Sequence, residues 1–303
     1  MRAVIIGAVE STEVAINAAG SACGWSIPLV VTLKSDLAAR HSDFCDLSEA
    51  ASKAGALVHQ TAQVNNAETI AAIVDAKPDY IFVIGWSQIC GPAFLATAPD
   101  RVIGYHPAAL PRLRGRAAIP WTILNDESIT AGSLFWIDEG VDSGAILEQQ
   151  FFHVAPDETA ASLYAKHMDA LAIMVTNALD KLAAGTEVRK IQDDRYATWA
   201  ARRTAQDGQI DWTCGTAEIL RLIRAVGRPY PGAFTYQNGE PITFWSASAL
   251  PEGARHHARP GQIVGQVGDG LIVKTIDGLL LVEEWESETG KRPAMHAKLG
   301  GVA

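Results

Sequence analysis

The chain has 303 residues, of which 48% are hydrophobic and 19% are charged, and its formal net charge is −9. This composition is ordinary for a soluble globular protein, and the length suits one large domain or two smaller ones. The negative charge disfavours a protein that follows nucleic-acid phosphates, because such binding needs a strong basic field.

The cysteines are few and widely separated. None of the four belongs to a CxxC pair, which argues against a structural zinc site and a disulfide framework: Cys23, Cys45, Cys90 and Cys214. No apolar stretch approaches the roughly 18 residues of a membrane span, and no leader-like segment follows Met1. We therefore expect a cytoplasmic protein with reduced thiols, no membrane span and no bound metal.

The first part of the chain alternates strand-like and helix-like segments. Residues 2–9 form a continuous apolar run, which is typical of a parallel strand buried on both faces. Further segments follow in alternation: strands at 27–33, 57–59 and 80–84, and helices at 12–20, 47–54 and 67–76. Strands that alternate with helices predict βαβ units and a parallel sheet.

Ligands of open α/β sheets bind outside the carboxyl ends of the strands. The loop Gly85–Cys90 follows the predicted strand 80–84 and is therefore a candidate pocket wall, as is the segment after 102–104. The sequence GxxxxGK[ST] is absent, and so is GxGxxG after the first strand. Nucleotide hydrolysis and Rossmann-type redox chemistry thus lose their main sequence support.

The remainder of the chain predicts two more parts. A helix at 117–125, strands at 131–137 and 145–154 and a long helix at 159–183 complete the first domain, residues 1–188. The polar segment 189–207 is the predicted linker. Short alternating strands separated by turn residues then favour a small antiparallel barrel over residues 208–303.

One stretch, residues 102–144, carries most of the special residues. His106 and Asp142 are 36 positions apart, and the helix and strand between them can fold the two ends together. Neutral imidazole is basic near pH 7, and a neighbouring carboxylate can fix its tautomer. A capped core histidine and a turn aspartate are the alternative. The prolines, arginines and glycines around them favour a catalytic pair.

Two motifs in this stretch resemble those of a known family. HPAALPRLRG resembles the HxSLLPxxRG signature of folate-dependent formyltransferases, and FWIDEGVDSG resembles their strand–DxGxDxG loop. The resemblance includes GWSQI and IDWTCGTAEILRLIRAVGRPYPGAF, and it covers most of residues 1–250. It implies an α/β fold: a formyltransferase-like, Rossmann-type parallel sheet followed by a small OB-like barrel.

The resemblance also implies a reaction. In this family a formyl group passes from 10-formyltetrahydrofolate to an amine, and no metal takes part. His106 and Asp142 match the catalytic histidine and aspartate. The amine must lose a proton, and the tetrahedral intermediate carries an oxyanion. By resemblance His106 would assist proton removal and polarise the formyl oxygen, and Asp142 would tune His106 and order a water.

The resemblance further implies the binding residues. Exposed main-chain groups at strand ends suit a pterin edge, which alternates donors and acceptors. The implied folate residues are Ile84, Gly85, Trp86, Ser87, Ile89, Leu110, Arg114, Ile137, Gly140 and Val141. Glu10, Ser11 and Lys34 are candidate acceptor contacts only because they sit at the ends of the first two predicted strands. A core aromatic is the alternative for Trp86, and a turn-stabilising cation is the alternative for Arg114.

One position departs from the family pattern. The family usually has an asparagine two residues before the histidine, where this chain has Gly104. One lost oxyanion donor typically costs about 2.7–4 kcal/mol of transition-state stabilisation. A main-chain N–H, Ser87 or Gln88 could substitute, a different substrate could relax the need, or activity could be lost. We favour the first of these, in which another hydrogen-bond donor replaces the missing asparagine amide.

The acceptor is predicted from the segment LKSDLAARHSDFCDLSEAA. Methionyl-tRNA formyltransferases carry a basic insertion here, but this chain has only Lys34, Arg40 and His41 beside three aspartates. SDFCDL instead resembles sugar N-formyltransferases, so we expect a small-molecule amine, most simply a nucleotide-linked amino sugar, and a candidate homodimer. The alternatives are a hydroxyornithine formyltransferase of siderophore assembly, a methionyl-tRNA formyltransferase, a non-catalytic folate-binding protein and a formyltetrahydrofolate hydrolase.

Overall fold

The computed structural model describes residues 1–40, 43–251 and 255–300, and the chain divides into two compact units. Each unit is built from three segments that are not contiguous in the sequence. Unit 1 comprises Met1–Ala118, Ile129–His153 and Tyr164–Ala201, and unit 2 comprises Ile119–Ser128, Val154–Leu163 and Arg202–Ala303.

Unit 1 is built on a seven-stranded sheet in the order β3-β2-β1-β4-β5-β7-β8. Its strands are β1 (Arg2–Ile6), β2 (Ser26–Leu33), β3 (Leu57–Thr61), β4 (Tyr80–Val83), β5 (Val102–His106), β7 (Ile129–Trp136) and β8 (Ile146–His153). The first five in this order are parallel, as predicted. The last two pair antiparallel, so the sheet is mixed.

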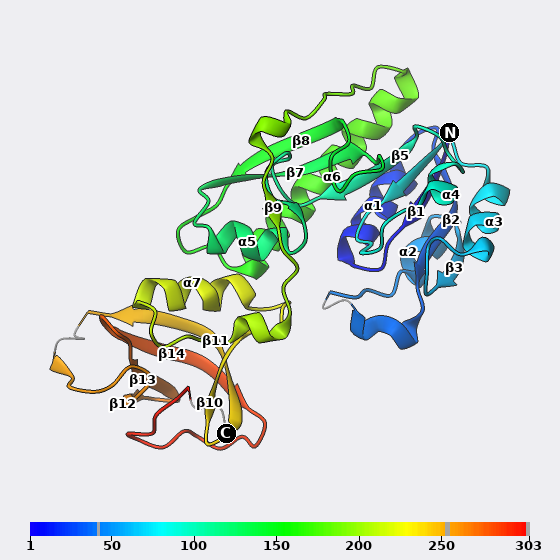
Figure 1. Cartoon of the computed structure of the whole chain (residues 1–303). Helices are drawn as coiled ribbons and strands as arrows, with labels where there is room; N and C mark the ends of the chain where they lie inside the picture. The colour runs from blue at the N-terminus through cyan, green and yellow to red at the C-terminus, as the bar shows by residue number, and fades with distance from the viewer. Residues whose placement is uncertain (41–42, 252–254, 301–303) are drawn as a thin grey trace. The chain divides into compact units, whose positions relative to one another are not determined.

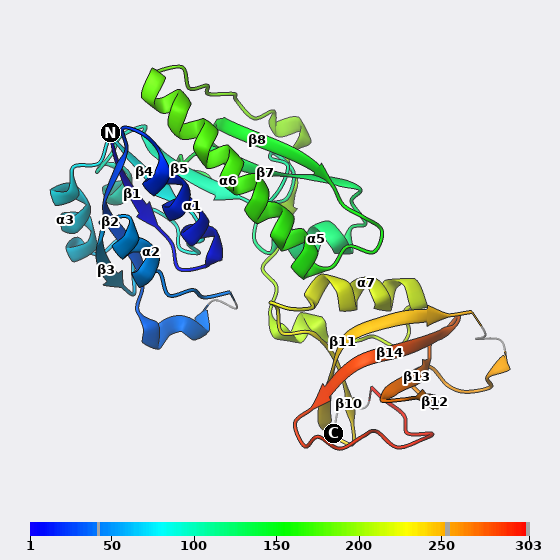
Figure 2. The ribbon, with the colours of Figure 1, turned by 180° about the vertical axis from the view of Figure 1, so that it is seen from behind.

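Helices cover both faces of this sheet, as Figures 1 and 2 show from opposite sides. One core cluster joins the sheet to α1 (Glu10–Ser21), α2 (Ser48–Lys53) and α6 (Ala160–Ala184). Another joins it to α3 (Ala67–Ala76) and α4 (Pro92–Leu95). Successive residues of a strand point to opposite faces, so Ile5 enters the first cluster and Ile6 the second. This explains why the N-terminal strand is apolar throughout.

The register of the central strands places the segments that follow β1, β4 and β5 at the same end of the sheet, where the carboxyl ends of these strands lie. Ile6 at the end of β1 pairs with Val83 at the end of β4, and Val83 pairs with Gly104 of β5. Strand β5 continues two residues further, to His106. The loop after β4 and the end of β5 therefore share the edge where the sequence predicted a pocket.

The predicted linker begins inside unit 1. Residues 189–201 belong to this unit, and β9 (Trp199–Ala200) pairs in parallel with β6 (Arg114–Gly115). Lys190 forms a bridge with Ile146 at the start of β8, and the Arg189 guanidinium lies 3.7 Å from the centre of the Trp136 ring. These residues are packed against the sheet.

Unit 2 contains a five-stranded antiparallel sheet in the order β10-β11-β14-β13-β12. Its strands are β10 (Ala233–Gln237), β11 (Glu240–Leu250), β12 (Ile263–Val267), β13 (Gly270–Lys274) and β14 (Leu279–Ser287). Helix α7 (Thr216–Val226) contacts β10 and β11, and it buries Ile219 and Ile223. Most of helix α5 (Ala118–Leu124) also belongs to this unit. The OB-like barrel remains a prediction.

Candidate active site

His106 is the last residue of β5, and its side chain is 8% exposed. Its Nε2 atom lies 2.7 Å from the main-chain oxygen of Leu113. A carbonyl oxygen can only accept, so Nε2 carries the hydrogen and the lone pair of the neutral ring is on Nδ1. The tautomer is thus set by Leu113 and not, as the sequence suggested, by the carboxylate.

Asp142 faces the other nitrogen of the same ring. Its Oδ2 atom lies 3.5 Å from His106 Nδ1 and accepts a hydrogen bond of 2.8 Å from the Gly115 N–H. A lone pair opposite a carboxylate gains nothing, whereas a protonated Nδ1 gains an ion pair. The Asp142 carboxylate is therefore placed to pair with an Nδ1 atom that has accepted a proton.

Strained main-chain conformations aim these groups at the imidazole. Leu113 has a φ of 55° and Asp142 a φ of 52°, in the left-handed region that non-glycine residues seldom adopt. Such conformations cost about 1–3 kcal/mol each and cluster at functional sites. Only glycine fits at position 115, because its φ is 108° and a Cβ atom there would lie 2.6 Å from the Ala200 oxygen.

A cavity of about 450 Å³ lies beside the pair, a size typical of small-molecule sites. It is formed by the loop after β4, the end of β5, the loop after β7 and the residues after β6. Its lining residues are Val83, Trp86–Cys90, Gly104–His106, Gly115, Arg116, Phe135 and Ile137–Asp142. At its rim Ile89 is 76% exposed and Val141 is 53% exposed, which leaves apolar surface for a ligand to cover.

Six of the ten predicted folate residues line this cavity: Trp86, Ser87, Ile89, Ile137, Gly140 and Val141. The other four are not among its lining residues. The Ile84 carbonyl accepts a hydrogen bond of 2.7 Å from the Thr12 hydroxyl, and Gly85 lies against Val9. Leu110 is buried in a small cluster with Phe135 and Ile146.

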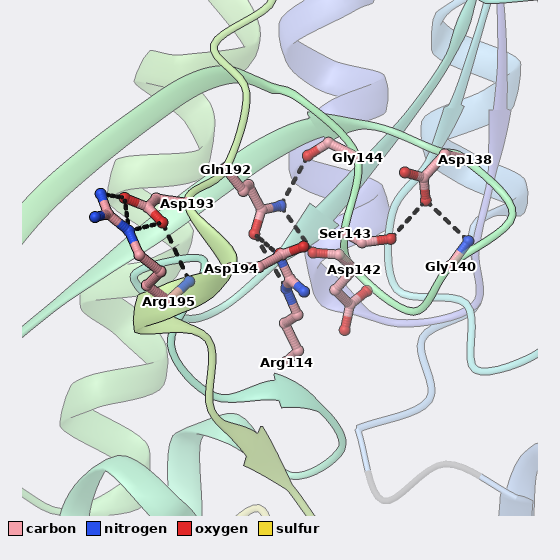
Figure 3. A network of polar contacts seen from close by, with 10 residues as sticks. All are labelled: Arg114, Asp138, Gly140, Asp142, Ser143, Gly144, Gln192, Asp193, Asp194 and Arg195. Carbon is pink, nitrogen blue, oxygen red and sulfur yellow. Dashed lines mark hydrogen bonds and ion pairs between the residues drawn. The ribbon is translucent and has the colours of Figure 1, made fainter.

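Arg114 is the fourth. Its side chain is 5% exposed, and its Nε and Nη2 atoms lie 3.1 and 2.8 Å from Gln192 Oε1 (Figure 3). Nη2 also lies 2.8 Å from Asp194 Oδ1. This is the position of the turn-stabilising cation that was the alternative for Arg114.

The three candidate acceptor contacts lie at the ends of the first two strands. Glu10, at the start of α1, and Lys34, after β2, are exposed, whereas Ser11 is buried. None of them is among the residues that line the cavity described above. Phe44 of the SDFCDL segment forms a bridge with Val9, which directly precedes Glu10, whereas Ser42 of that segment lies outside the described residues.

The site of the missing asparagine is filled by apolar groups. A Cβ atom on Gly104 would lie 2.9 Å from Phe135 Cζ and 3.1 Å from Ile137 Cγ1. Gln88, one of the proposed substitutes, donates to the Ala62 oxygen at 2.8 Å and accepts from the Val64 N–H at 3.1 Å. Its amide therefore serves the neighbouring loop.

Sequence reasoning missed two residues of the site: Arg116, which lines the cavity, and Gln192, which supports the Asp142 loop. Arg116 Nη1 donates a 2.8 Å hydrogen bond to the Ser87 oxygen, which joins two of the cavity walls. Its place directly after the Arg-Gly turn was the available signal. Gln192, which ties Arg114 to the Asp142 loop, lies in a segment whose polar composition gave no signal.

A buried polar pair lies behind the cavity. The Tyr105 hydroxyl is 3.0 Å from His167 Nδ1, and His167 is fully buried. Burial, with a smaller effect of His106, lowers the pKa of His167 to about 3, and burial raises the pKa of Tyr105. His167 is therefore a neutral structural residue at pH 7.

Three further features of the described residues concern metal sites, membrane-spanning helices and a second cavity. Within residues 1–40, 43–251 and 255–300 no group of three or more His, Cys, Asp or Glu side chains could hold a metal ion. In the same residues no helix has the length and apolar character needed to cross a membrane. A second cavity, of about 670 Å³, lies in unit 2 against Trp212 and Arg259, and its lining includes no histidine.

Residues 1–179 match the formyl transferase family, and residues 202–301 match the family described as the formyl transferase C-terminal domain. The chain therefore belongs to the formyl transferase family, as its His106 and Asp142 motifs predicted. The break between the two matches falls where unit 1 gives way to the C-terminal part of unit 2.

Two curated relatives are methionyl-tRNA formyltransferases. The protein of Geobacter metallireducens is 33% identical over 82% of this chain and 78% of its own length. The protein of Ruminiclostridium cellulolyticum is 30% identical over 94% of this chain and 90% of its own length. Their similarity thus extends over both family matches.

Solved structures share the fold at lower identity. HypX from Aquifex aeolicus, in complex with tetrahydrofolic acid, has a TM-score of 0.68 and 18% identity, and the match covers 95% of this chain but 44% of HypX. An N-formyltransferase from Helicobacter canadensis, in complex with folinic acid and dTDP-3-aminofucose, has a TM-score of 0.65 and 17% identity. That match covers 92% of this chain and 98% of the neighbour.

Proposed function

We propose that this chain is an N-formyltransferase that moves the formyl group of 10-formyltetrahydrofolate to the amine of a small molecule, most simply a nucleotide-linked amino sugar. The observation that carries the proposal is the His106–Asp142 pair beside the 450 Å³ cavity. Because Nε2 already donates to Leu113, Nδ1 is the nitrogen that can take a proton.

The cavity fits a folate donor. A folate has a flat pterin and an aromatic ring, and both need apolar walls and main-chain partners. Ile89 and Val141 offer exposed apolar surface, and the loops 86–90 and 137–142 offer main-chain groups. Two neighbours of the same fold hold tetrahydrofolic acid and folinic acid, which supports this assignment.

In this reaction the acceptor nitrogen attacks the formyl carbon of the donor, and the bond from that carbon to the folate nitrogen N10 breaks as N10 takes up the proton that the amine has lost. His106 Nδ1 removes a proton from the acceptor amine, and the Asp142 carboxylate stabilises the imidazolium that results. The Gly115 N–H holds that carboxylate in place at 2.8 Å. Such proton transfer is worth about 10²–10⁴-fold in rate.

The oxyanion donor differs from that of the family. Gly104 has no side chain, and the Gln88 amide is engaged elsewhere. We infer that a main-chain N–H of the cavity wall or the Trp86 indole N–H takes this role. The Trp86 Nε1 atom is buried and has no hydrogen-bond partner among the described residues, which a native structure rarely leaves without a purpose.

The charge distribution supports a small acceptor. Residues 202–303 contain eleven Lys and Arg residues and eleven Asp and Glu residues, so the C-terminal part has no net charge. Lys34 and Arg40 are accompanied by Asp36, Asp43 and Asp46. An acceptor tRNA would require many neutralised phosphates, and this chain offers few unopposed cations for them.

Methionyl-tRNA is the second candidate acceptor. The observation in its favour is the 33% and 30% identity to two methionyl-tRNA formyltransferases. Homologous enzymes that share a reaction can still differ in acceptor, because the acceptor is read by loops outside the reacting pair.

The test is a formyl-transfer assay with 10-formyltetrahydrofolate and separate acceptors: nucleotide-linked 3-amino and 4-amino sugars, hydroxyornithine and methionyl-tRNA. Turnover of an amino sugar that disappears in His106→Ala supports the proposal. Turnover of methionyl-tRNA alone overturns the small-molecule acceptor. Tight donor binding without transfer to any of them would instead favour a folate-binding protein.

A further inference from the structure

We propose that Gln192 is the positioning residue of this site and that it acts through Asp142. The inference rests on the proposed role of the His106–Asp142 pair. Gln192 is distant from both residues in sequence, is 8% exposed, and lies in the segment that the sequence predicted to be a linker.

One amide group makes four hydrogen bonds (Figure 3). Gln192 Nε2 donates to the main-chain oxygens of Asp142, at 2.8 Å, and Gly144, at 2.7 Å. Its Oε1 atom accepts from Nε and Nη2 of Arg114, at 3.1 and 2.8 Å. The hydrogen-bonding capacity of this amide is thus fully used, and it fixes the Asp142 loop to Arg114.

The same segment also holds the Asp142 side chain. Arg114 is followed directly by Gly115, whose N–H donates to Asp142 Oδ2 at 2.8 Å. Asp142 is therefore fixed twice: its main chain through Gln192 and its carboxylate through Gly115. A residue with a φ of 52° keeps that conformation only where its surroundings over-determine it, and this pair of restraints does so.

Glutamine has the required chemistry at this position. Its amide accepts and donates at the same end of the side chain, whereas a carboxylate cannot donate and a guanidinium or ammonium cannot accept. The accepting end faces the Arg114 cation, and the donating end faces two carbonyl oxygens. A charged donor such as the Arg114 guanidinium strengthens such a hydrogen-bond chain.

The donor-binding part of the loop has a separate support. Asp138 Oδ1 accepts from the Gly140 N–H at 3.0 Å and from the Ser143 hydroxyl at 2.8 Å, on the other side of Asp142 in Figure 3. Gly140 and Val141 line the cavity, and neither bonds to Gln192 among the contacts described here. Loss of Gln192 should therefore release Asp142 more than the donor-binding wall.

The decisive variants are Gln192→Glu and Gln192→Met. Glutamate keeps the partner for Arg114 but cannot donate to Asp142 and Gly144, and methionine fills the volume without hydrogen bonds. We expect both to lower kcat by about tenfold to a hundredfold, since small misplacements of a catalytic group cost this much, with a much smaller change in donor KM. If glutamate restores kcat, Gln192 merely pairs with Arg114 and the proposal is overturned.

Asp194→Asn is the matched control. It weakens the contact between Arg114 and the Asp194 carboxylate, whose side chain is 81% exposed, and leaves the Gln192 bonds intact, so kcat should remain near the wild-type value. In the Asp142→Asn background, Gln192→Met should add little, because both substitutions disable the same group. Fully additive losses would mean that Gln192 acts by another route.

A readout without turnover separates this inference from the proposed function. Amide hydrogen exchange at Gly115 reports its bond to Asp142 Oδ2. We expect faster exchange in Gln192→Glu than in wild type and in Asp194→Asn, with melting temperature and donor binding retained. Unchanged Gly115 exchange overturns the positioning role, whereas absence of formyl transfer in the wild type overturns the proposed function and leaves the exchange result decisive.

Discussion

The Nε2 atom of His106 donates to the Leu113 oxygen at 2.7 Å, and this one contact decides which nitrogen faces Asp142. With Nε2 protonated, the neutral ring presents its lone pair from Nδ1, 3.5 Å from the carboxylate. Leu113 maintains the contact with a left-handed main chain of φ 55°. The geometry of the catalytic pair thus depends on a residue that carries no chemistry of its own.

Removal of either member of the pair should stop the reaction. We expect His106→Ala and Asp142→Asn each to lower formyl transfer by at least about a hundredfold, because proton transfer from the amine loses its base or the stabilisation of the imidazolium. The assay is turnover of 10-formyltetrahydrofolate with whichever of the candidate acceptors the wild type formylates. Near-normal turnover in either variant would show that another residue is the base.

Two controls distinguish loss of catalysis from a general effect of the substitutions. His153→Ala, at an exposed position at the end of β8, should leave turnover unchanged. Donor binding measured by calorimetry should survive His106→Ala, because the cavity walls are mainly main chain and apolar side chains. Loss of donor binding in that variant would assign His106 to the folate pocket.

Ile89 should contribute to donor binding without contributing to stability. Its side chain is 76% exposed, so Ile89→Ser costs the free protein little, whereas a bound donor would lose an apolar contact. Burial of an isoleucine is worth about 1.5–3 kcal/mol, so the donor Kd should rise by about tenfold. Ile276→Ser, at a 58% exposed position in unit 2, is the control. Equal effects of the two substitutions would place the donor elsewhere.

Gly104→Asn should restore the amide of the family but strain the core. Its Cβ atom would lie 2.9 Å from the buried Phe135 ring, and overpacking of this kind costs about 1–3 kcal/mol of unfolding free energy. Chemical denaturation should show this loss, and Phe135→Leu in the same chain should recover part of it. Turnover should persist, since other donors serve the oxyanion. A folded variant with no turnover would mean that the space at Gly104 is itself needed.

His167 should make stability depend on pH. Its pKa is about 3 in the folded protein and 6.5 in an unperturbed chain, because burial disfavours its charged form. The unfolded chain therefore binds the extra proton between these values, so this contribution to stability is complete above pH 6.5 and is lost as the pH falls toward 3. From pH 8 to pH 5 the loss is about 2 kcal/mol.

Urea unfolding of wild type and His167→Gln at pH 8 and pH 5 tests this prediction. Glutamine can still bond to the Tyr105 hydroxyl but takes up no proton, so the variant should lose about 2 kcal/mol less than wild type over this interval. His153→Gln, at an exposed position, should behave as wild type. An unchanged difference between the two proteins at both pH values would contradict a neutral His167 in the fold.

The strands of unit 1 were predictable because burial repeats locally. Val4 and Ile5 face opposite layers, so both must be apolar, and the run 2–9 carries that information. The end of α3 at Ala76 was also predictable, because Pro78 disfavours a helical conformation of the residue before it. The antiparallel end of the sheet was not predicted, since a strand with apolar residues does not specify the direction of its partner.

The family and the proximity of His106 and Asp142 could also be predicted from sequence. His106 and Asp142 lie in two short motifs of fixed spacing, and the chain brings them within 3.5 Å. Six of the ten folate residues line the cavity: Trp86, Ser87 and Ile89 follow β4 at the carboxyl end of the parallel strands, and Ile137, Gly140 and Val141 lie in the loop after β7, which runs antiparallel to β5. Glu10, Ser11 and Lys34 had no motif, and they lie outside the lining of that cavity.

Tertiary structure decided how the pair is held. The segment 189–201 has the polar composition of a linker, yet it packs in unit 1 and brings Gln192 to Arg114, 78 positions earlier. No local pattern reveals that contact, because the Gln192 amide reaches Arg114, Asp142 and Gly144 only after the sheet has formed. The tautomer of His106, the filling of the space beside Gly104 and the restraint on Asp142 arise from such long-range contacts. The sequence by itself determined the strands and the two motifs that contain His106 and Asp142, whose signals are local.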